Sequence, residues 1–156
     1  MRPIAGTEPY EIVPADPAHW RALAELITAS GLPLDGLEPH LGSAIVARDS
    51  DGIVGCAALE LYGHDALLRS VAVAPARRGG GVGLALTAAS IELARRHDVR
   101  TLWLLTETAG DFFPRFGFEP TTRDAVPGTV RQSVEFTSAC PESATVMRLS
   151  LRSAGS

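Results

Sequence analysis

The sequence has no lysine, so all 14 of its basic residues are arginines, and a compositional bias of the source genome is the simplest explanation. Acidic residues outnumber basic ones and give a formal net charge of −4 at pH 7. Proteins that bind nucleic acids or anionic membranes without sequence specificity need a basic surface. The composition therefore argues against a nucleic-acid or a membrane partner.

Cysteine is also scarce, and long hydrophobic runs are absent. The two cysteines, Cys56 and Cys140, lie far apart in unlike contexts, which does not suit a disulfide framework or a metal site. No run approaches the roughly 18 apolar residues of a membrane span, and the N-terminal stretch lacks the apolar core of a secretory signal. We expect a cytoplasmic protein with reduced thiols and no bound metal.

Hydrophobic periodicity predicts one domain over residues 1–156 with an α/β (α+β) fold. Strands are expected at 10–14, at 66–75, at 99–107, from 118 onward, at 144–151, and as a hairpin within 43–63. Helices are expected from Asp16, over 82–97 and near 109–117, with a loop over 127–143 that includes a candidate short helix. This order predicts a single mixed sheet of about seven strands with helices on both faces.

Each of the two long helices is predicted to bury one face. The first starts with Asp16 as its cap and Pro17 in its first turn. Its expected buried residues are Trp20, Leu23, Leu26 and Ile27. In the second helix the residues expected to point inward are Leu84, Leu86, Ile91 and Leu93.

A glycine-rich stretch, "RRGGGVGLAL", lies between a predicted strand and the second helix. The phosphate loop of nucleotide hydrolases requires Gly-Lys-Ser/Thr, but Leu84 follows Gly83. The dinucleotide fingerprint G-x-G-x-x-G fails as well, because its last position falls on Leu84 or Leu86. Neither of these nucleotide-binding loops is present.

What the stretch does fit is R/Q-x-x-G-x-G/A, starting at Arg78. Glycines without Cβ atoms let consecutive main-chain N–H groups close around a diphosphate at a helix N-terminus. The motif resembles the acyl-CoA loop of the GNAT superfamily of N-acetyltransferases, which implies acetyl-CoA as the donor and a GNAT fold. The alternative is a flexible surface turn without a ligand. The loop residues expected to bind acetyl-CoA are Arg78, Gly79, Gly80, Gly81, Val82, Gly83 and Leu84, with Arg77 adding charge beside them.

A second stretch, "AGDFFPRFGF", resembles the A-x-x-F-Y-x-x-x-G-F motif of the same superfamily. The resemblance implies that Phe112, Phe113 and Arg115 contact the cofactor. The tyrosine that commonly protonates the leaving CoA thiolate is Phe113 here, so that general acid is missing. A thiolate still leaves at neutral pH, because a free thiol has a pKa of about 8.5. The resemblance also implies that a bulged strand at Val71, Ala72 and Val73 presents main-chain amides to the thioester carbonyl.

Within the superfamily, "LLRSVAV", "LLTETAGDFFPRFGF" and "EFTSACPESATVM" resemble the arsenic-resistance-associated N-acetyltransferases. The chain is also similar to short amino-acid N-acetyltransferases that make N-acetylglutamate. These resemblances imply acetylation of the α-amino group of a small anionic amino acid or a glutamate-like antibiotic such as arsinothricin or phosphinothricin. They also imply a homodimer.

Two charged residues on neighbouring predicted strands, Glu60 and Arg69, are candidates for the acceptor site. If the strands pair antiparallel, the two side chains approach each other. Glu60 would then be the catalytic base and a substrate contact, while Arg69, with Ser70 beside it, would hold the acceptor's anionic group. A structural ion pair is the alternative, since an adjacent arginine weakens a carboxylate as a base. Arg131 is a second candidate for anion binding, against a purely solvent-exposed role.

Two further residues are expected to have no chemical role. His64 lies in a turn and reads as a solvated loop histidine, and Cys140 reads as structural. A non-catalytic acyl-CoA-binding sensor remains the rival hypothesis to an enzyme, because Phe113 replaces the tyrosine acid.

Overall fold

The computed structural model describes residues 8–107, 111–139 and 144–151. Its strands form one seven-stranded sheet in the order β1-β2-β3-β4-β5-β7-β6. The strands are β1 Glu11–Pro14, β2 Ala44–Asp49, β3 Gly52–Tyr62, β4 Asp65–Val73, β5 Thr101–Thr106, β6 Glu119–Thr121 and β7 Thr145–Ser150. Only β4 and β5 pair in parallel, and every other neighbouring pair is antiparallel. The mixed sheet predicted from the sequence is confirmed.

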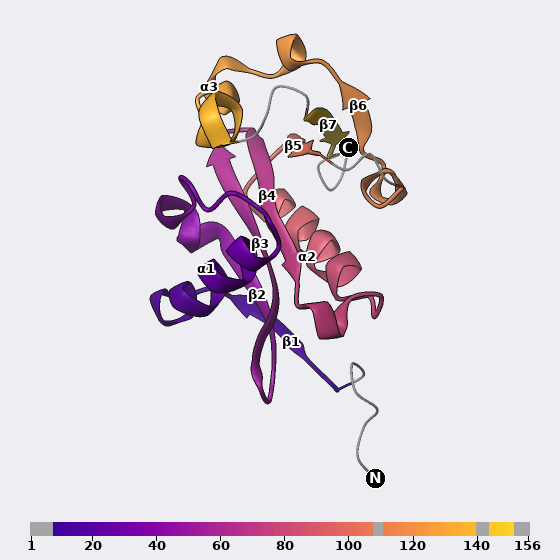
Figure 1. Ribbon diagram of the computed structural model, residues 1–156. Helices are drawn as coiled ribbons and strands as arrows, with labels where there is room; N and C mark the ends of the chain where they lie inside the picture. Colours follow the sequence, from indigo (N-terminus) through magenta and orange to yellow (C-terminus); the bar gives the residue numbers. More distant parts are fainter. Residues whose placement is uncertain (1–7, 108–110, 140–143, 152–156) are drawn as a thin grey trace.

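Helices cover both faces of the sheet, as predicted (Figure 1). They are α1 Trp20–Ala29, α2 Val82–Arg96 and the short α3 Gly128–Arg131. Successive side chains of β3 point to opposite faces. Thus Leu59 packs in the cluster that contains Leu86 of α2, and Ala58 packs in the cluster that contains Leu23 of α1. In the described part of the chain, no helix has the length and apolarity to cross a membrane.

Short helical turns connect these elements. The 3₁₀ turns are Pro17–His19, Glu38–Ser43, Pro75–Arg77, Phe113–Phe116 and Arg123–Ala125, and a π-helical segment spans Glu135–Ala139. Asp16 caps the first of these turns by accepting a hydrogen bond from the main chain of Ala18 at 2.8 Å, so α1 itself begins only at Trp20.

Two irregularities in β4 create the space for a site. β4 pairs with β5 only from Asp65 to Leu67, although both strands continue, so the two strands diverge beyond that point. On its other side, β4 bulges against β3, because Ser70 and Val71 stand opposite the single residue Ala57. Ser70 takes a left-handed φ of 59° there. The bulge is the one expected near Val71.

Candidate active site

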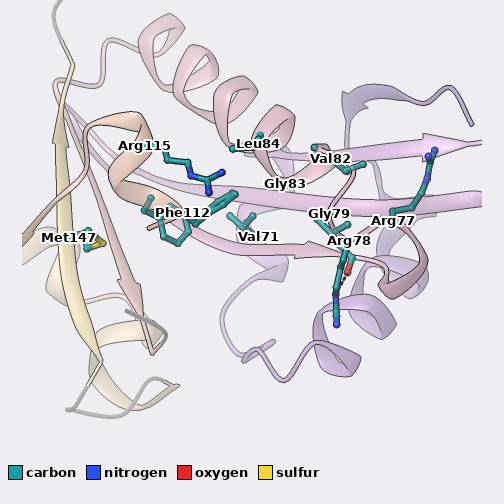
Figure 2. Close-up of a pocket in the computed structure, with 13 residues that line it drawn as sticks. Val71, Arg77, Arg78, Gly79, Val82, Gly83, Leu84, Phe112, Arg115 and Met147 are labelled. Carbon is teal, nitrogen blue, oxygen red and sulfur yellow. Dashed lines mark hydrogen bonds between the residues drawn. The ribbon is translucent and has the colours of Figure 1, made fainter. Parts of the chain in front are cut away.

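A cavity of about 460 Å³ opens between the glycine loop, the N-terminus of α2 and the 3₁₀ turn after β5 (Figure 2). Of the residues predicted to bind the cofactor, all but Ala72 and Gly80 line it. The lining residues are Val71, Val73, Arg77, Arg78, Gly79, Gly81, Val82, Gly83, Leu84, Phe112, Phe113, Arg115 and Met147. Ala72 instead points into the buried cluster beneath α1. We call this space the donor cavity.

The glycine loop has the backbone that its sequence suggests. Gly79 and Gly81 have φ values of 83° and 87°, in the left-handed region that other residues rarely adopt. A Cβ atom at either position would meet nothing within 4 Å, so the loop is open toward the cavity. Gly81 is the N-cap of α2, and no side chain caps that end of the helix. Open main-chain donors at a helix N-terminus fit the diphosphate of acetyl-CoA.

Leu84 corrects one expectation about α2. The sequence placed this side chain inward, but it is 38% exposed. It lies in the first turn of the helix and lines the donor cavity instead of the core.

The two arginines before the glycines point in opposite directions (Figure 2). Arg78 is exposed and donates a hydrogen bond from Nε to the carbonyl of Val73 at 3.1 Å. Arg77 is buried, and its Nη2 reaches Asp49 Oδ2 at 3.2 Å and the carbonyl of Glu8 at 2.6 Å. Arg77 thus lines the donor cavity, but its guanidinium is paired with Asp49, so it brings less net charge to the loop than the sequence suggested.

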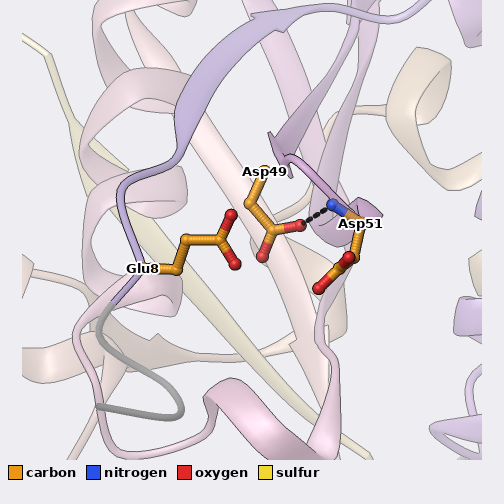
Figure 3. A group of neighbouring side chains, drawn as sticks. All are labelled: Glu8, Asp49 and Asp51. Carbon is orange, nitrogen blue, oxygen red and sulfur yellow. Dashed lines mark hydrogen bonds between the residues drawn. The ribbon is translucent and has the colours of Figure 1, made fainter. Parts of the chain in front are cut away.

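Three carboxylates meet where Arg77 is anchored (Figure 3). One carboxylate oxygen from each of Glu8, Asp49 and Asp51 lies within 4.8 Å of the other two. Asp49 accepts a hydrogen bond from the main chain of Asp51 at 2.8 Å, and Glu8 accepts one from the hydroxyl of Ser50. These contacts fasten the β2–β3 turn, so we assign no metal to the cluster.

A second cavity, of about 260 Å³, adjoins the first. Val71 and Phe113 line both cavities, which therefore meet where β4 and β5 diverge. The second cavity is lined by Ser30, Gly31, Leu32, Pro33, Leu68, Arg69, Ser70, Val71, Leu104, Leu105, Thr106, Glu107, Phe113, Glu135 and Ala144. We call this space the acceptor cavity.

The structure brings Glu60 and Arg69 together, as the predicted strand pairing requires. Arg69 Nη1 lies 2.9 Å from Glu60 Oε2. Arg69 Nε also lies 3.2 Å from Glu135 Oε1 and 3.1 Å from Ser70 Oγ, and Nη2 lies 3.0 Å from the carbonyl of Pro33. These partners engage all three guanidinium nitrogens, so Arg69 is held in place before any acceptor anion binds.

Glu60 is enclosed by other side chains and lines neither cavity. Tyr62, two residues along the same face of β3, donates a hydrogen bond from its hydroxyl to Glu60 Oε1. His40 Nε2 lies 3.8 Å from the same oxygen. Burial raises the pKa of Tyr62 well above its usual range, and the neighbouring carboxylate of Glu60 raises it further. The geometry thus favours the structural ion pair over the catalytic role that the sequence suggested for Glu60.

The other candidate residues lie apart from both cavities or outside the described residues. Arg131 is exposed at the end of α3 and lines neither cavity. His64 makes a hydrogen-bond contact at 3.0 Å between its Nδ1 and the carbonyl of Asp98, in an exposed turn. Cys140, and the first two residues of the "AGDFFPRFGF" motif, lie outside the described residues.

Three of the residues at the cavities escaped sequence reasoning. Glu135 follows α3 in an irregular segment without periodicity, and Met147 reaches the donor cavity only through the pairing of β7 with β5. Glu107 lines the acceptor cavity at the end of the strongly apolar β5. The one feature of the sequence that could have indicated a site role for Glu107 is its position directly after a central strand.

Comparisons with known proteins agree with this architecture. Residues 40–120 match a protein family described as "Acetyltransferase (GNAT) domain". The chain is 28% identical over 123 residues to amino-acid acetyltransferases of two strains of Neisseria meningitidis. That alignment covers 75% of the chain but only 28% of the relative, so the chain spans about a quarter of these proteins' length.

Solved structures share the fold. N-acetylglutamate synthase from Neisseria gonorrhoeae, complexed with coenzyme A and N-acetyl-glutamate, has a TM-score of 0.79 at 24% identity, covering 92% of this chain and 35% of its own. Rv2747 from Mycobacterium tuberculosis, in complex with CoA, has a TM-score of 0.78 at 24% identity, covering 91% and 99%. The ribosomal-protein-S18-alanine N-acetyltransferase from Escherichia coli has a TM-score of 0.69 at 19% identity, and the match covers 94% of this chain and 97% of that protein.

Proposed function

Because the chain belongs to the GNAT acetyltransferase family, we propose that it transfers an acetyl group from acetyl-CoA to the α-amino group of a small amino acid. The observation that carries the proposal is the meeting of two cavities at Val71 and Phe113. The larger cavity ends at a glycine loop suited to a diphosphate, and the smaller one has the volume of a small metabolite. Both substrates would be bound at once, with the reacting atoms at the junction.

On the donor side, the chain would hold acetyl-CoA through its main chain. The loop from Arg78 to Gly83 and the first turn of α2 would contact the diphosphate, and Arg115 would add a cation on the opposite wall. Amides of Val71 and Val73, at the bulge in β4, would stabilise the negative charge that develops on the thioester oxygen. Acetyl-CoA itself supplies an acetyl group that is activated as a thioester.

On the acceptor side, we propose a free amino acid of the size of glutamate. A cavity of about 260 Å³ can hold a free amino acid of this size. Glutamate, phosphinothricin and arsinothricin are the acceptors to test first, because the sequence resembles enzymes for these compounds and its relatives include amino-acid acetyltransferases. N-acetylglutamate formation is the alternative within this class. A homodimer and a cytoplasmic location remain predictions.

A second candidate function is an acyl-CoA sensor without catalysis. Phe113 favours it, since this residue stands at the junction of the cavities and has no proton to donate. A sensor would bind acetyl-CoA and would show no turnover with any amine.

The test is the release of CoA thiol from acetyl-CoA in the presence of each acceptor, alongside calorimetric titration with acetyl-CoA. We expect binding and turnover with at least one of the three acceptors. The ratio of kcat/KM for glutamate to that for phosphinothricin separates the two acceptor classes. Binding without turnover on any amine would support the sensor, and absence of binding would refute the donor cavity.

A further inference from the structure

Glu135 forms part of the wall of the acceptor cavity, whereas Glu60, the base suggested by the sequence, does not. The side chain of Glu135 is 8% exposed and that of Glu60 is 2% exposed. We propose that Glu135 is the carboxylate that binds the ammonium group of the acceptor and takes its proton. This assignment rests on the proposed acetyl transfer.

Both carboxylates contact Arg69, but Glu60 is the less suitable base because it lies behind the guanidinium and lines neither cavity. Oε2 accepts a hydrogen bond from Arg69 at 2.9 Å, and Oε1 accepts one from the hydroxyl of Tyr62. Since Arg69 lines the cavity and Glu60 does not, an ammonium group in the cavity meets the guanidinium before it can reach Glu60. Glu60 holds Arg69 in place and acts as a positioning residue.

Glu135 is fixed from two directions while it faces the cavity. Arg69 Nε lies 3.2 Å from Glu135 Oε1, and the main-chain N–H of Glu135 donates a hydrogen bond to Ser133 Oγ at 3.2 Å. The residue opens the π-helical segment Glu135–Ala139, a form of helix that is frequent at functional sites. A carboxylate held in this way needs little rearrangement to receive a proton.

The charges around the cavity favour a cation beside Glu135. Among the described lining residues, Arg69 is the one cation, and it is already paired with two carboxylates, while Glu107 and Glu135 are both acidic. The titratable groups near Glu135 are Arg69 on β4, Glu107 at the end of β5, Glu60 and Tyr62 on β3 beyond Arg69, and Arg123 over the ring of Phe136. The described wall of the cavity therefore carries more carboxylates than cations, which favours an ammonium group there.

The proton and electron pairs balance in this step. One proton passes from the acceptor's ammonium nitrogen to the carboxylate of Glu135. The lone pair that is freed attacks the carbonyl carbon of acetyl-CoA, so a C–N bond forms. The C–S bond breaks and its electron pair leaves with sulfur as the CoA thiolate. The nitrogen, which carries a second proton after the attack, releases it to the thiolate or to solvent, and Glu135 returns its own proton to solvent.

The decisive variant is Glu135→Gln, assayed for kcat/KM of the acceptor from pH 6 to pH 9.5. At pH 7 we expect a loss of about 100-fold, the usual scale for removing a general base. The loss should shrink by about tenfold per pH unit toward the pKa of the amine, because the amine is then deprotonated without help. Calorimetric affinity for acetyl-CoA should stay as in the wild type.

Glu60→Gln is the matched comparison, since it makes the same substitution on the other carboxylate that contacts Arg69. It should give a smaller loss that does not change with pH. Glu92→Gln, on the exposed face of α2, controls for the change in net charge and should leave kcat/KM unchanged.

Three results would overturn the assignment. The first is a Glu135→Gln variant within about threefold of the wild type at pH 7, and the second is a loss of equal size at every pH. If Glu135→Gln fails to fold, Glu135→Asp is tested in its place and should lower kcat while keeping the pH dependence of the wild type. A pH dependence that differs from the wild type in Glu135→Asp is the third result that would overturn the assignment. A wild-type protein that acetylates no amine would refute the proposed function itself, and the assignment with it.

Discussion

Arg69 Nη1 lies 2.9 Å from Glu60 Oε2, and neither side chain is more than 2% exposed, so a buried ion pair joins β3 to β4. The same guanidinium contacts Glu135 beyond α3 and the carbonyl of Pro33 beyond α1. One side chain therefore fastens four segments of the chain around the acceptor cavity. Its contribution to folding can be measured apart from its contribution to activity.

Arg69→Met should lower the free energy of unfolding by about 3–5 kcal/mol, because it leaves the carboxylate of Glu60 buried without its cation. Urea denaturation at pH 7 measures the change. The double variant Glu60→Gln/Arg69→Met should lose less than the sum of the two single variants, since it removes both charges. A loss below about 1 kcal/mol for Arg69→Met would mean that the pair is not desolvated as the structure indicates.

Gly81→Ala and Gly83→Ala should change stability in opposite directions. At Gly81 the φ of 87° disfavours any residue with a Cβ, so alanine should cost about 1 kcal/mol of unfolding free energy. At Gly83, inside α2, the nearest atoms to a Cβ are 3.5 Å away in Phe112 and Val73, an ordinary contact. Alanine should therefore stabilise the helix there by up to about 1 kcal/mol. Urea denaturation of both variants measures the two changes in unfolding free energy. Changes of the same sign would mean that the loop is folded differently.

Phe113→Tyr should restore a proton donor at the junction of the two cavities. Near pH 6.5 we expect kcat to rise by up to about tenfold, because the tyrosine hydroxyl can protonate the CoA sulfur as the C–S bond breaks. The gain should decline as the pH approaches about 10, where a tyrosine hydroxyl itself ionises. Steady-state kinetics across this range measures it, and identical profiles for the two proteins would show that thiolate departure does not limit the rate.

The thiol of Cys56 makes the fold sensitive to alkali. Burial raises the pKa of Cys56 from 9.0 to about 12, although a hydrogen bond from Ala72 lowers it slightly. The unfolded thiol ionises first as pH rises, so its share of stability is complete below pH 9 and is lost between pH 9 and about 12. The expected slope is about 1.4 kcal/mol per pH unit.

Urea denaturation gives the free energy of unfolding at pH 9 and at pH 10.5. Between these two values the Cys56→Ala variant should lose less unfolding free energy than the wild type, because the alanine variant lacks the thiol that causes the slope. Other groups titrate in both proteins and cancel in the comparison. Parallel curves for the wild type and the variant would show that the thiol is solvated in the folded protein.

The sequence predicted the mixed sheet and most of the residues that line the donor cavity. Alternation of apolar residues over 43–63 predicts the hairpin of β2 and β3, because its period of two is a local property of the chain. The glycine loop could be predicted because its signal is also local in the sequence. Left-handed backbone at Gly79 and Gly81 leaves a direct trace in the residue type.

The acceptor cavity was only partly predictable, because the residues that form its ion pairs come from segments far apart in the sequence. The pairing of Glu60 with Arg69 follows from a hairpin, but the third member, Glu135, arrives from an irregular segment near the end of the chain. Whether Arg77 faces the loop or Asp49 likewise depends on the β2–β3 turn, which no local pattern connects to the glycines. Spacing along the chain carries no information on such contacts.

Because Val71 and Phe113 line both cavities, the acyl group of the donor and the amine of the acceptor share the space at the junction. An acyl group longer than acetyl would extend past these side chains into the space meant for the amine. Propionyl and butyryl thioesters would then be used best with the shortest amines, so the selectivities for acyl chain and nucleophile would form one joint property of the protein.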